Sequence, residues 1–139
     1  MTKRDLAIEA LKSHVNLPYI WGGNDPLAGF DCSGLMVEVL QAVGVLAKGS
    51  DFTADGLSKK FPETEIFQPG VMVFWDWNKD GRIDHVEMIA FLDDEGEVYT
   101  IGASGGDSAT SSRQAAVSGD AYVKIRPLVG GYTIALDPF

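Results

Sequence analysis

Residues 30–43 read FDCSGLMVEVLQAV and carry the change from a glycine-rich loop into a helix. The spacing of the apolar side chains predicts one buried stripe from Asp31 onward, and Gly44 is a typical helix stop. Cys32 therefore stands in the first helical turn, where unpaired backbone N–H groups favour a thiolate. The thiolate is the nucleophilic form of cysteine, although a lone cysteine is often an inert, buried one.

Other helices and strands are predicted on both sides of this segment. Residues 3–14 have a partial apolar face typical of a helix, and residues 55–60 suggest a short one. Beyond Pro69-Gly70 the chain has short runs rich in β-forming residues, at 71–75, 86–92, 97–101, 122–126 and 132–136. Helices followed by strands predict an α+β fold with an antiparallel sheet of about five strands. Small, polar residues predict a loop over 104–119.

Length, charge and cysteine content exclude several classes of protein. The 139 residues suit one domain, which we expect to span 1–139, and the net charge of −9 disfavours nucleic acid and anionic membranes as partners. No apolar run reaches the roughly 20 residues of a membrane span. The first residues, MTKRDLAIEALKSH, lack the apolar core of a signal peptide. One cysteine rules out an internal disulfide, and we expect a monomer.

Two histidines are the candidate bases for the thiol. His14 ends the first predicted helix, where a cation offsets the helix dipole, and we expect a structural role. His85 opens a predicted strand, and its alternation puts His85, Glu87 and Ile89 on one face. If this sheet packs against the helix of Cys32, His85 can take the thiol proton; otherwise it is a surface or capping histidine.

Four stretches resemble the NlpC family of papain-like cell-wall cysteine peptidases: LPYIWGG (17–23), FDCSGL (30–35), QPGVMVFW (68–75) and DHVEMI (84–89). The resemblance covers about residues 5–105 and implies a reduced papain-like fold. It implies that Cys32 is the nucleophile, that His85 is the general base, and that Tyr19 lies near the oxyanion or the thiolate. No cofactor is needed for this bond-breaking chemistry.

The same resemblance predicts the substrate cleft and shows two departures from the family pattern. The residues expected in the cleft are Asp31, Ser33, Trp21 and Ser104, with Trp77 a further candidate and Trp75 expected in the core. Gly102 stands where the family usually carries a polar residue, often histidine, that orients the catalytic imidazole. A backbone carbonyl, a water molecule, Ser104 or Asp107 would then have to hold the ring. Val71 stands where the family often has an acidic residue.

Residues 76–87, DWNKDGRIDHVE, fit the calcium-loop pattern D-x-[DN]-x-[DN]-G-x5-E. Calcium takes six to eight oxygen ligands, and Gly81 allows the sharp turn that gathers them. The predicted ligands are Asp76, Asn78, Asp80, the Arg82 carbonyl, Asp84 and Glu87. The flanks are strands rather than helices, and strand alternation aims Glu87 toward the side of His85. The alternative is a hairpin turn of solvated acidic residues.

The resemblance therefore implies hydrolysis of peptide bonds in peptidoglycan stem peptides, of the D-glutamyl–diamino acid type, and the loop pattern adds the expectation that the cysteine peptidase is calcium-stabilised. The alternatives are an amidase of the CHAP type and a non-catalytic, calcium-binding structural module of a phage tail or wall-associated assembly. Since peptidoglycan lies outside the cytoplasm, we expect a virion-associated protein, one delivered by a secretion system, or part of a larger exported protein.

Overall fold

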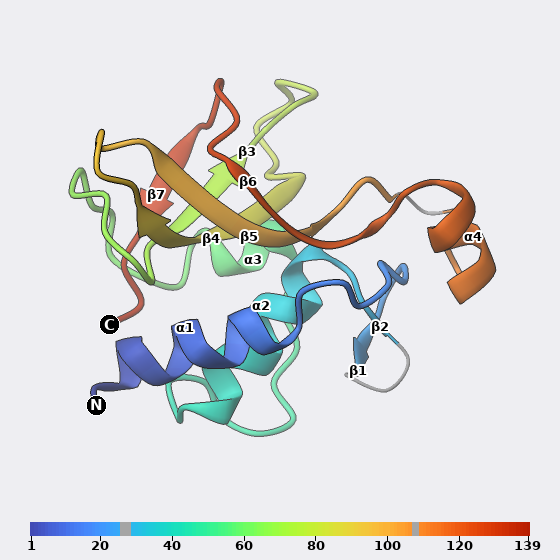
Figure 1. The fold of residues 1–139 in the computed structure, drawn as a ribbon, viewed down its shortest axis with the longest axis horizontal. Coiled ribbons are helices and arrows are strands. Elements are labelled where there is room, and N and C mark those ends of the chain that lie inside the picture. The colour runs from blue at the N-terminus through green and yellow to red at the C-terminus, as the bar shows by residue number, and fades with distance from the viewer. Residues whose placement is uncertain (26–28, 107–108) are drawn as a thin grey trace.

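The computed structural model describes residues 1–139 except 26–28 and 107–108, and it folds as helices packed on one antiparallel sheet (Figure 1). The sheet has five strands in the order β6-β5-β4-β3-β7, and a separate two-stranded hairpin pairs β1 with β2. Their bounds are β1 (Asn24–Asp25), β2 (Gly29–Phe30), β3 (Met72–Trp75), β4 (His85–Leu92), β5 (Val98–Ser104), β6 (Tyr122–Pro127) and β7 (Ile134–Leu136). The α+β class and the five-stranded sheet are confirmed.

The helices are α1 (Lys3–Ser13), α2 (Cys32–Ala42), α3 (Ala54–Leu57) and α4 (Arg113–Ser118). A capping box between Thr2 and Asp5 starts α1, and the Asp31 side chain caps α2. The prediction of a loop over 104–119 was wrong, because β5 runs on to Ser104 and α4 lies within that segment. The sequence Gln-Ala-Ala-Val within α4 favours a helix, and the Ser112 hydroxyl caps it by accepting a hydrogen bond from the Ala115 amide. The glycines and serines around this segment made the whole stretch resemble a loop.

Alternation along the strands divides the core between the two faces of the sheet. Val86 and Met88 belong to the large cluster that also contains the buried side chains of α1 and α2. Val73 and Ile89 belong to a smaller cluster, partly covered by Phe67 and residues 128–129. The sheet is thus buried on both sides along β3 and β4, which fixes the register of the strand that His85 begins.

The two ends of the chain lie close together at one end of the molecule (Figure 1). Arg4 of α1 donates to the carboxylate of Asp137 at 2.8 Å and to the carbonyl of Pro69 at 2.9 Å. These contacts tie the first helix to the last strand and to the turn before β3. None of the helices in the described part of the chain is long and apolar enough to cross a membrane.

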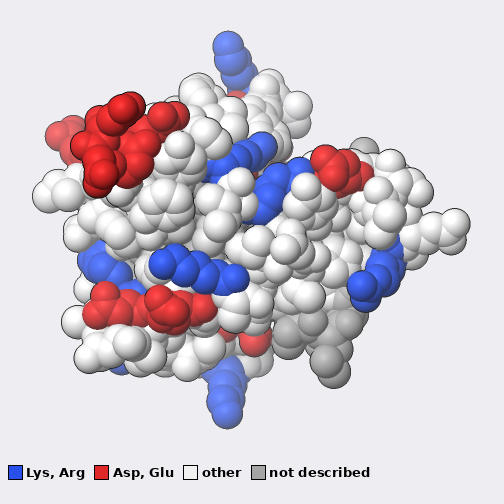
Figure 2. Space-filling view, viewed as in Figure 1, with Lys and Arg blue, Asp and Glu red and all other residues white. Residues whose placement is uncertain are grey.

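Charge is unevenly distributed over the surface. Figure 2 shows acidic side chains gathered at one corner of the molecule, where Figure 1 places the turn between β4 and β5. This turn holds Asp93, Asp94, Glu95 and Glu97. The cluster lies at the far end of β4 from His85, so its exposed charge is not part of the histidine environment.

Candidate active site

Cys32 begins α2 at a point where the backbone is tightly constrained. Asp31 accepts a hydrogen bond from the Gly34 amide at 2.7 Å and another from the Gly22 amide at 3.0 Å, so one carboxylate holds both the helix start and the preceding loop. A Cβ on Gly34 would lie 1.9 Å from the carbonyl oxygen of Gly23. The glycine therefore allows the loop to pack against the first turn, and Cys32 is held there with 8% of its surface exposed.

His85, the first residue of β4, lies close enough to Cys32 for the two side chains to interact electrostatically, and both line one cleft. Its Nε2 lies 2.6 Å from Oε2 of Glu87. Trp77 stacks on the same ring with centroids 4.8 Å apart, and Trp75 lies at 5.5 Å. His85 is 4% exposed, and its ring is held by the two indoles and by the contact of Nε2 with Glu87.

Glu87 has a fully buried carboxylate, which is unusual unless the charge is compensated. Thr100 donates its hydroxyl hydrogen to Oε1 at 2.6 Å, and the Arg126 guanidinium pairs with the same carboxylate. Sequence reasoning placed Glu87 in the calcium shell, and that was wrong because this carboxylate lies on His85. Strand alternation is the feature of the sequence that links Glu87 to His85. No pattern in the sequence linked Thr100 or Arg126 to this site.

The charges of this cluster support one another. Burial opposes the ionised form of Glu87, but hydrogen bonds and charge from His85 and Arg126 outweigh it and lower the pKa of Glu87 to about 2. Burial also opposes the charged imidazole, but hydrogen bonds to Cys32 and Glu87 outweigh it and raise the pKa of His85 to about 9. At neutral pH the cluster therefore contains an imidazolium between a carboxylate and a sulfur.

Cys32 and His85 open into a cleft of about 360 Å³. Its aromatic walls are Tyr19, which is 5% exposed, and Trp21 and Trp77, which are each about half exposed. Ser104 lines the same cleft, and its buried hydroxyl has no hydrogen-bond partner among the described residues. Trp75 lies in the core, as expected.

Asp31 and Ser33 line a second hollow of about 260 Å³ beside the Cys32 cleft, together with Asp51 and Thr53. Asp31 and Ser33 flank Cys32 in the sequence, but they line this second hollow rather than the predicted cleft. Burial raises the pKa of Asp31, against the effect of its hydrogen bonds from the Gly34 and Gly22 amides.

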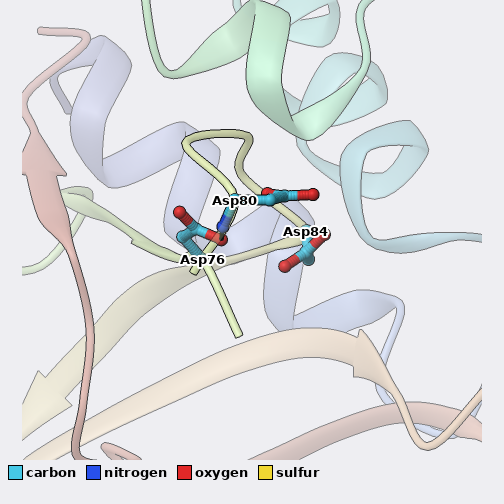
Figure 3. A group of neighbouring side chains, drawn as sticks. All are labelled: Asp76, Asp80 and Asp84. Carbon is cyan, nitrogen blue, oxygen red and sulfur yellow. Dashed lines mark hydrogen bonds between the residues drawn. The ribbon is translucent and has the colours of Figure 1, made fainter. Parts of the chain in front are cut away.

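The acidic loop before His85 gathers three carboxylates. Oxygens of Asp76, Asp80 and Asp84 lie within 4.8 Å of one another, and Figure 3 shows them grouped around the same part of the loop. Asp76 accepts from the amides of Asp80 and Gly81 at 3.2 and 2.9 Å, which bends the loop back on itself. The Asn78 side chain donates to Asp84 at 3.3 Å. The structure therefore brings together these predicted oxygen ligands and leaves Glu87 out.

Comparison with known proteins decides the family. The model of the NlpC/P60 family matches residues 16–126, which include both Cys32 and His85. The chain belongs to the NlpC/P60 family. Solved NlpC/P60 structures share the fold of this domain: the protein from Bacillus cereus ATCC 10987 gives a TM-score of 0.69 at 24% identity, over 96% of this chain and 39% of that one. The NlpC/p60 domain of the peptidoglycan hydrolase SagA gives 0.66 at 20% identity, over 96% and 97%.

Two curated relatives come from Bacillus subtilis strain 168. This NlpC/P60 domain is 38% identical over 79 residues to the bifunctional muramidase/DL-endopeptidase CwlT, covering 56% of this chain and 23% of that protein. It is 30% identical over 84 residues to the gamma-DL-glutamyl hydrolase, covering 60% and 20%. The chain spans less than a quarter of the length of the curated relatives it matches.

The NlpC/P60 domain has no side chain at position 102 to orient the imidazole, as its sequence indicated. Ser104, one of the replacements considered above, does not do so, because its hydroxyl has no partner among the described residues. Asp107, another, lies outside the described residues. The group on the second nitrogen of His85 is Glu87, which comes from the same strand.

We expect the free energy of unfolding to fall as pH rises from about 6.5 to about 9. Folded His85, with its pKa raised to about 9, keeps a proton that an unfolded histidine loses near pH 6.5. Its stabilisation is therefore complete below about pH 6.5 and is lost progressively as pH rises to about 9. The contribution of Glu87 is complete above about pH 4.5 and disappears only as pH falls toward 2. Urea unfolding at several pH values measures both.

The matched controls are His85→Gln and His14→Gln, since these are the two histidines of the chain. His85→Gln should flatten the decline between pH 6.5 and 9, by up to about 3 kcal/mol across the range. His14→Gln should leave it unchanged. An equal decline in both variants would show that another group is responsible.

Proposed function

We propose that this NlpC/P60 domain is a cysteine peptidase that hydrolyses stem peptides of bacterial peptidoglycan at a bond of the D-glutamyl–diamino acid type. The observation that carries the proposal is that Cys32 and His85 line one cleft and interact electrostatically there. The printed activities of two relatives, a DL-endopeptidase and a gamma-DL-glutamyl hydrolase, support the substrate class.

The chemistry uses the proton held by His85. The sulfur of Cys32 attacks the scissile carbonyl carbon, a C–S bond forms, and the imidazolium of His85 gives its proton to the leaving amine as the C–N bond breaks. Water then attacks the thioester, His85 takes the proton from that water, and the thiolate leaves. The carbonyl oxygen gains negative charge in both steps and would be met by backbone N–H groups at the start of α2, beside Tyr19.

The cleft suits a peptide rather than a large folded partner. Tyr19, Trp21 and Trp77 provide apolar walls. The Ser104 hydroxyl, which has no partner within the described part of the chain, offers a hydrogen bond to a bound peptide group. The adjoining hollow beside Asp31 and Ser33 would extend the binding surface past the scissile bond. Cys32 and His85 come from the same chain, which supports a monomer as the working unit.

Purified muropeptides test this function directly. Wild-type protein should release peptide fragments cut after D-glutamate, as read by mass spectrometry, whereas Cys32→Ala and His85→Ala should lower the rate by about 10⁴-fold or more. Lys12→Gln is the control, since Lys12 is an exposed residue of α1 that does not line the cleft, and it should retain cleavage.

The fragment masses separate the alternatives. Release of whole stem peptides from muramic acid would identify an amidase and overturn the proposed bond. Cleavage that survives Cys32→Ala would overturn the thiol mechanism. If folded wild-type protein cuts no muropeptide, the proposed substrate is wrong and the structural-module alternative is favoured.

We also propose that the loop of residues 76–84 binds calcium and so stabilises the segment before His85. Three converging carboxylates support this, because they repel one another without a cation and calcium prefers such oxygens. Asn78 and the Arg82 carbonyl would complete the protein ligands together with water. The ion would hold the loop and would take no part in bond breaking.

Calcium should raise the melting temperature, and a chelator should lower both the melting temperature and activity. At a concentration 100 times the dissociation constant, binding adds about 2.7 kcal/mol, which is roughly 10 °C for a domain of this size. Asp80→Asn should abolish the shift, and Asp94→Asn, in the other acidic turn, should keep it. An unchanged melting temperature at millimolar calcium would show that the loop is not a calcium site.

We further propose that the domain acts outside the cytoplasm, where peptidoglycan lies, on a virion, after delivery by a secretion system, or within a larger exported protein. The curated relatives support the last route, since the match covers only 12–23% of their length.

A further inference from the structure

We propose that Glu87 is the positioning residue of the catalytic histidine, and that Gly102 is glycine because this carboxylate occupies the space of a side chain there. The proposal rests on the function proposed above and names the group that holds His85. It transfers the orienting role from β5, where the family pattern has it, to the strand of His85 itself.

Glycine at position 102 is explained by space rather than by backbone conformation. Its φ is not in the left-handed region that favours glycine. A Cβ added there would lie 2.4 Å from Cγ of Glu87, closer than real Cβ atoms approach, and 3.1 Å from its Cβ. The pairing of Met88 with Ile101 places Glu87 and Gly102 side by side on neighbouring strands. A side chain at position 102 would therefore push the Glu87 side chain out of its present place.

The contacts of Glu87 are arranged to hold the imidazole in one orientation. Oε2 lies within hydrogen-bonding distance of Nε2 of His85, and Oε1 accepts a hydrogen bond from the hydroxyl of Thr100. Arg126 braces the carboxylate from β6. With Nε2 committed to Glu87, Nδ1 is the nitrogen left to exchange a proton with Cys32. This matches the logic of a catalytic triad, in which a third group fixes the ring that serves the nucleophile.

A carboxylate does more than a neutral third residue. A carboxylate accepts hydrogen bonds with both of its oxygens, so Glu87 can hold the ring while Thr100 and Arg126 hold Glu87. An amide at this position would keep only one acceptor oxygen.

Replacing Glu87 tests the charge and the contact separately. Glu87→Ala should lower kcat by about 10²- to 10⁴-fold with little change in KM, because it removes the contact that orients the ring. Glu87→Gln keeps the shape and one acceptor oxygen, so it should lower kcat by less than Glu87→Ala does. Glu97→Gln, at an exposed glutamate in the turn before β5, is the matched control and should leave kcat and KM unchanged. Circular dichroism and melting curves establish that each variant is folded.

The space argument predicts a double-mutant cycle. Gly102→Ala should displace Glu87 and lower kcat about as much as Glu87→Ala does, yet cost less than about 3-fold further in the Glu87→Ala background. Glu87→Gly with Gly102→His should recover activity relative to Glu87→Gly alone, because it returns an orienting group to β5. Equal losses from Gly102→Ala in both backgrounds would overturn the space argument.

A readout that needs no substrate keeps this proposal distinct from the proposed function. Alkylation of Cys32 by iodoacetamide at a fixed pH should be slowed by Glu87→Ala and by Gly102→Ala but not by Glu97→Gln, because the reactivity of the thiol depends on the imidazole that Glu87 holds. If muropeptides are not cut but this slowing occurs, the substrate is wrong and the positioning role stands. Equal alkylation rates for wild type and Glu87→Ala, with folded protein, would overturn the positioning role.

Discussion

A buried negative charge organises this active site. The carboxylate of Glu87 is fully shielded from water, and desolvation on that scale is unfavourable by several kcal/mol unless cations and donors surround the group. The fold supplies them from three strands, with His85 on β4, Thr100 on β5 and Arg126 on β6. The imidazole is thus one of the groups that stabilise the buried charge of Glu87. Its orientation and its protonation both follow from its contact with this carboxylate.

The sheet makes this arrangement possible through its register. Strand pairing in an antiparallel sheet puts specific residues opposite one another, and a slip by one residue would turn Glu87 and His85 to the other face. Apolar packing on both faces of β4 prevents the slip, because Val86 and Met88 are buried against the helices and Ile89 lies in the second cluster. The chemistry of the site therefore depends on core residues that do not touch it.

Cys32, the proposed nucleophile, is held by a different set of contacts. Asp31 links the Gly22 amide to the first turn of α2, and Gly34 lets the two backbones approach. Helix and sheet then bring Cys32 and His85 together from segments more than fifty residues apart. Each partner is fixed by its own secondary structure, so their meeting needs no long flexible loop. Such preorganisation lowers the reorganisation required during catalysis.

Much of the fold and of the candidate site could be predicted from local sequence. The features that were not predicted have one cause in common. Runs of β-forming residues gave the five strands, and a glycine-rich loop before an apolar stripe gave the helix of Cys32. The contact of Glu87 with His85 was not predicted because two patterns disagreed about this residue. The calcium-loop pattern made it a calcium ligand, whereas strand alternation placed it on the face of His85. Alternation prevailed because the residue is inside a paired strand, where the backbone fixes which way a side chain points.

The acidic loop and the histidine are mechanically connected even though Glu87 is not shared between them. Trp77 belongs to the loop, next to Asp76, and stacks on the imidazole at 4.8 Å. The far end of the loop is also anchored, because the amide of Ile83 donates to Asp55 of α3 at 3.0 Å. The Asp76 carboxylate holds the loop through the amides of Asp80 and Gly81, and the neighbouring Trp77 indole lies over His85. A cation that gathered Asp76, Asp80 and Asp84 would therefore act on the imidazole through this stacking contact.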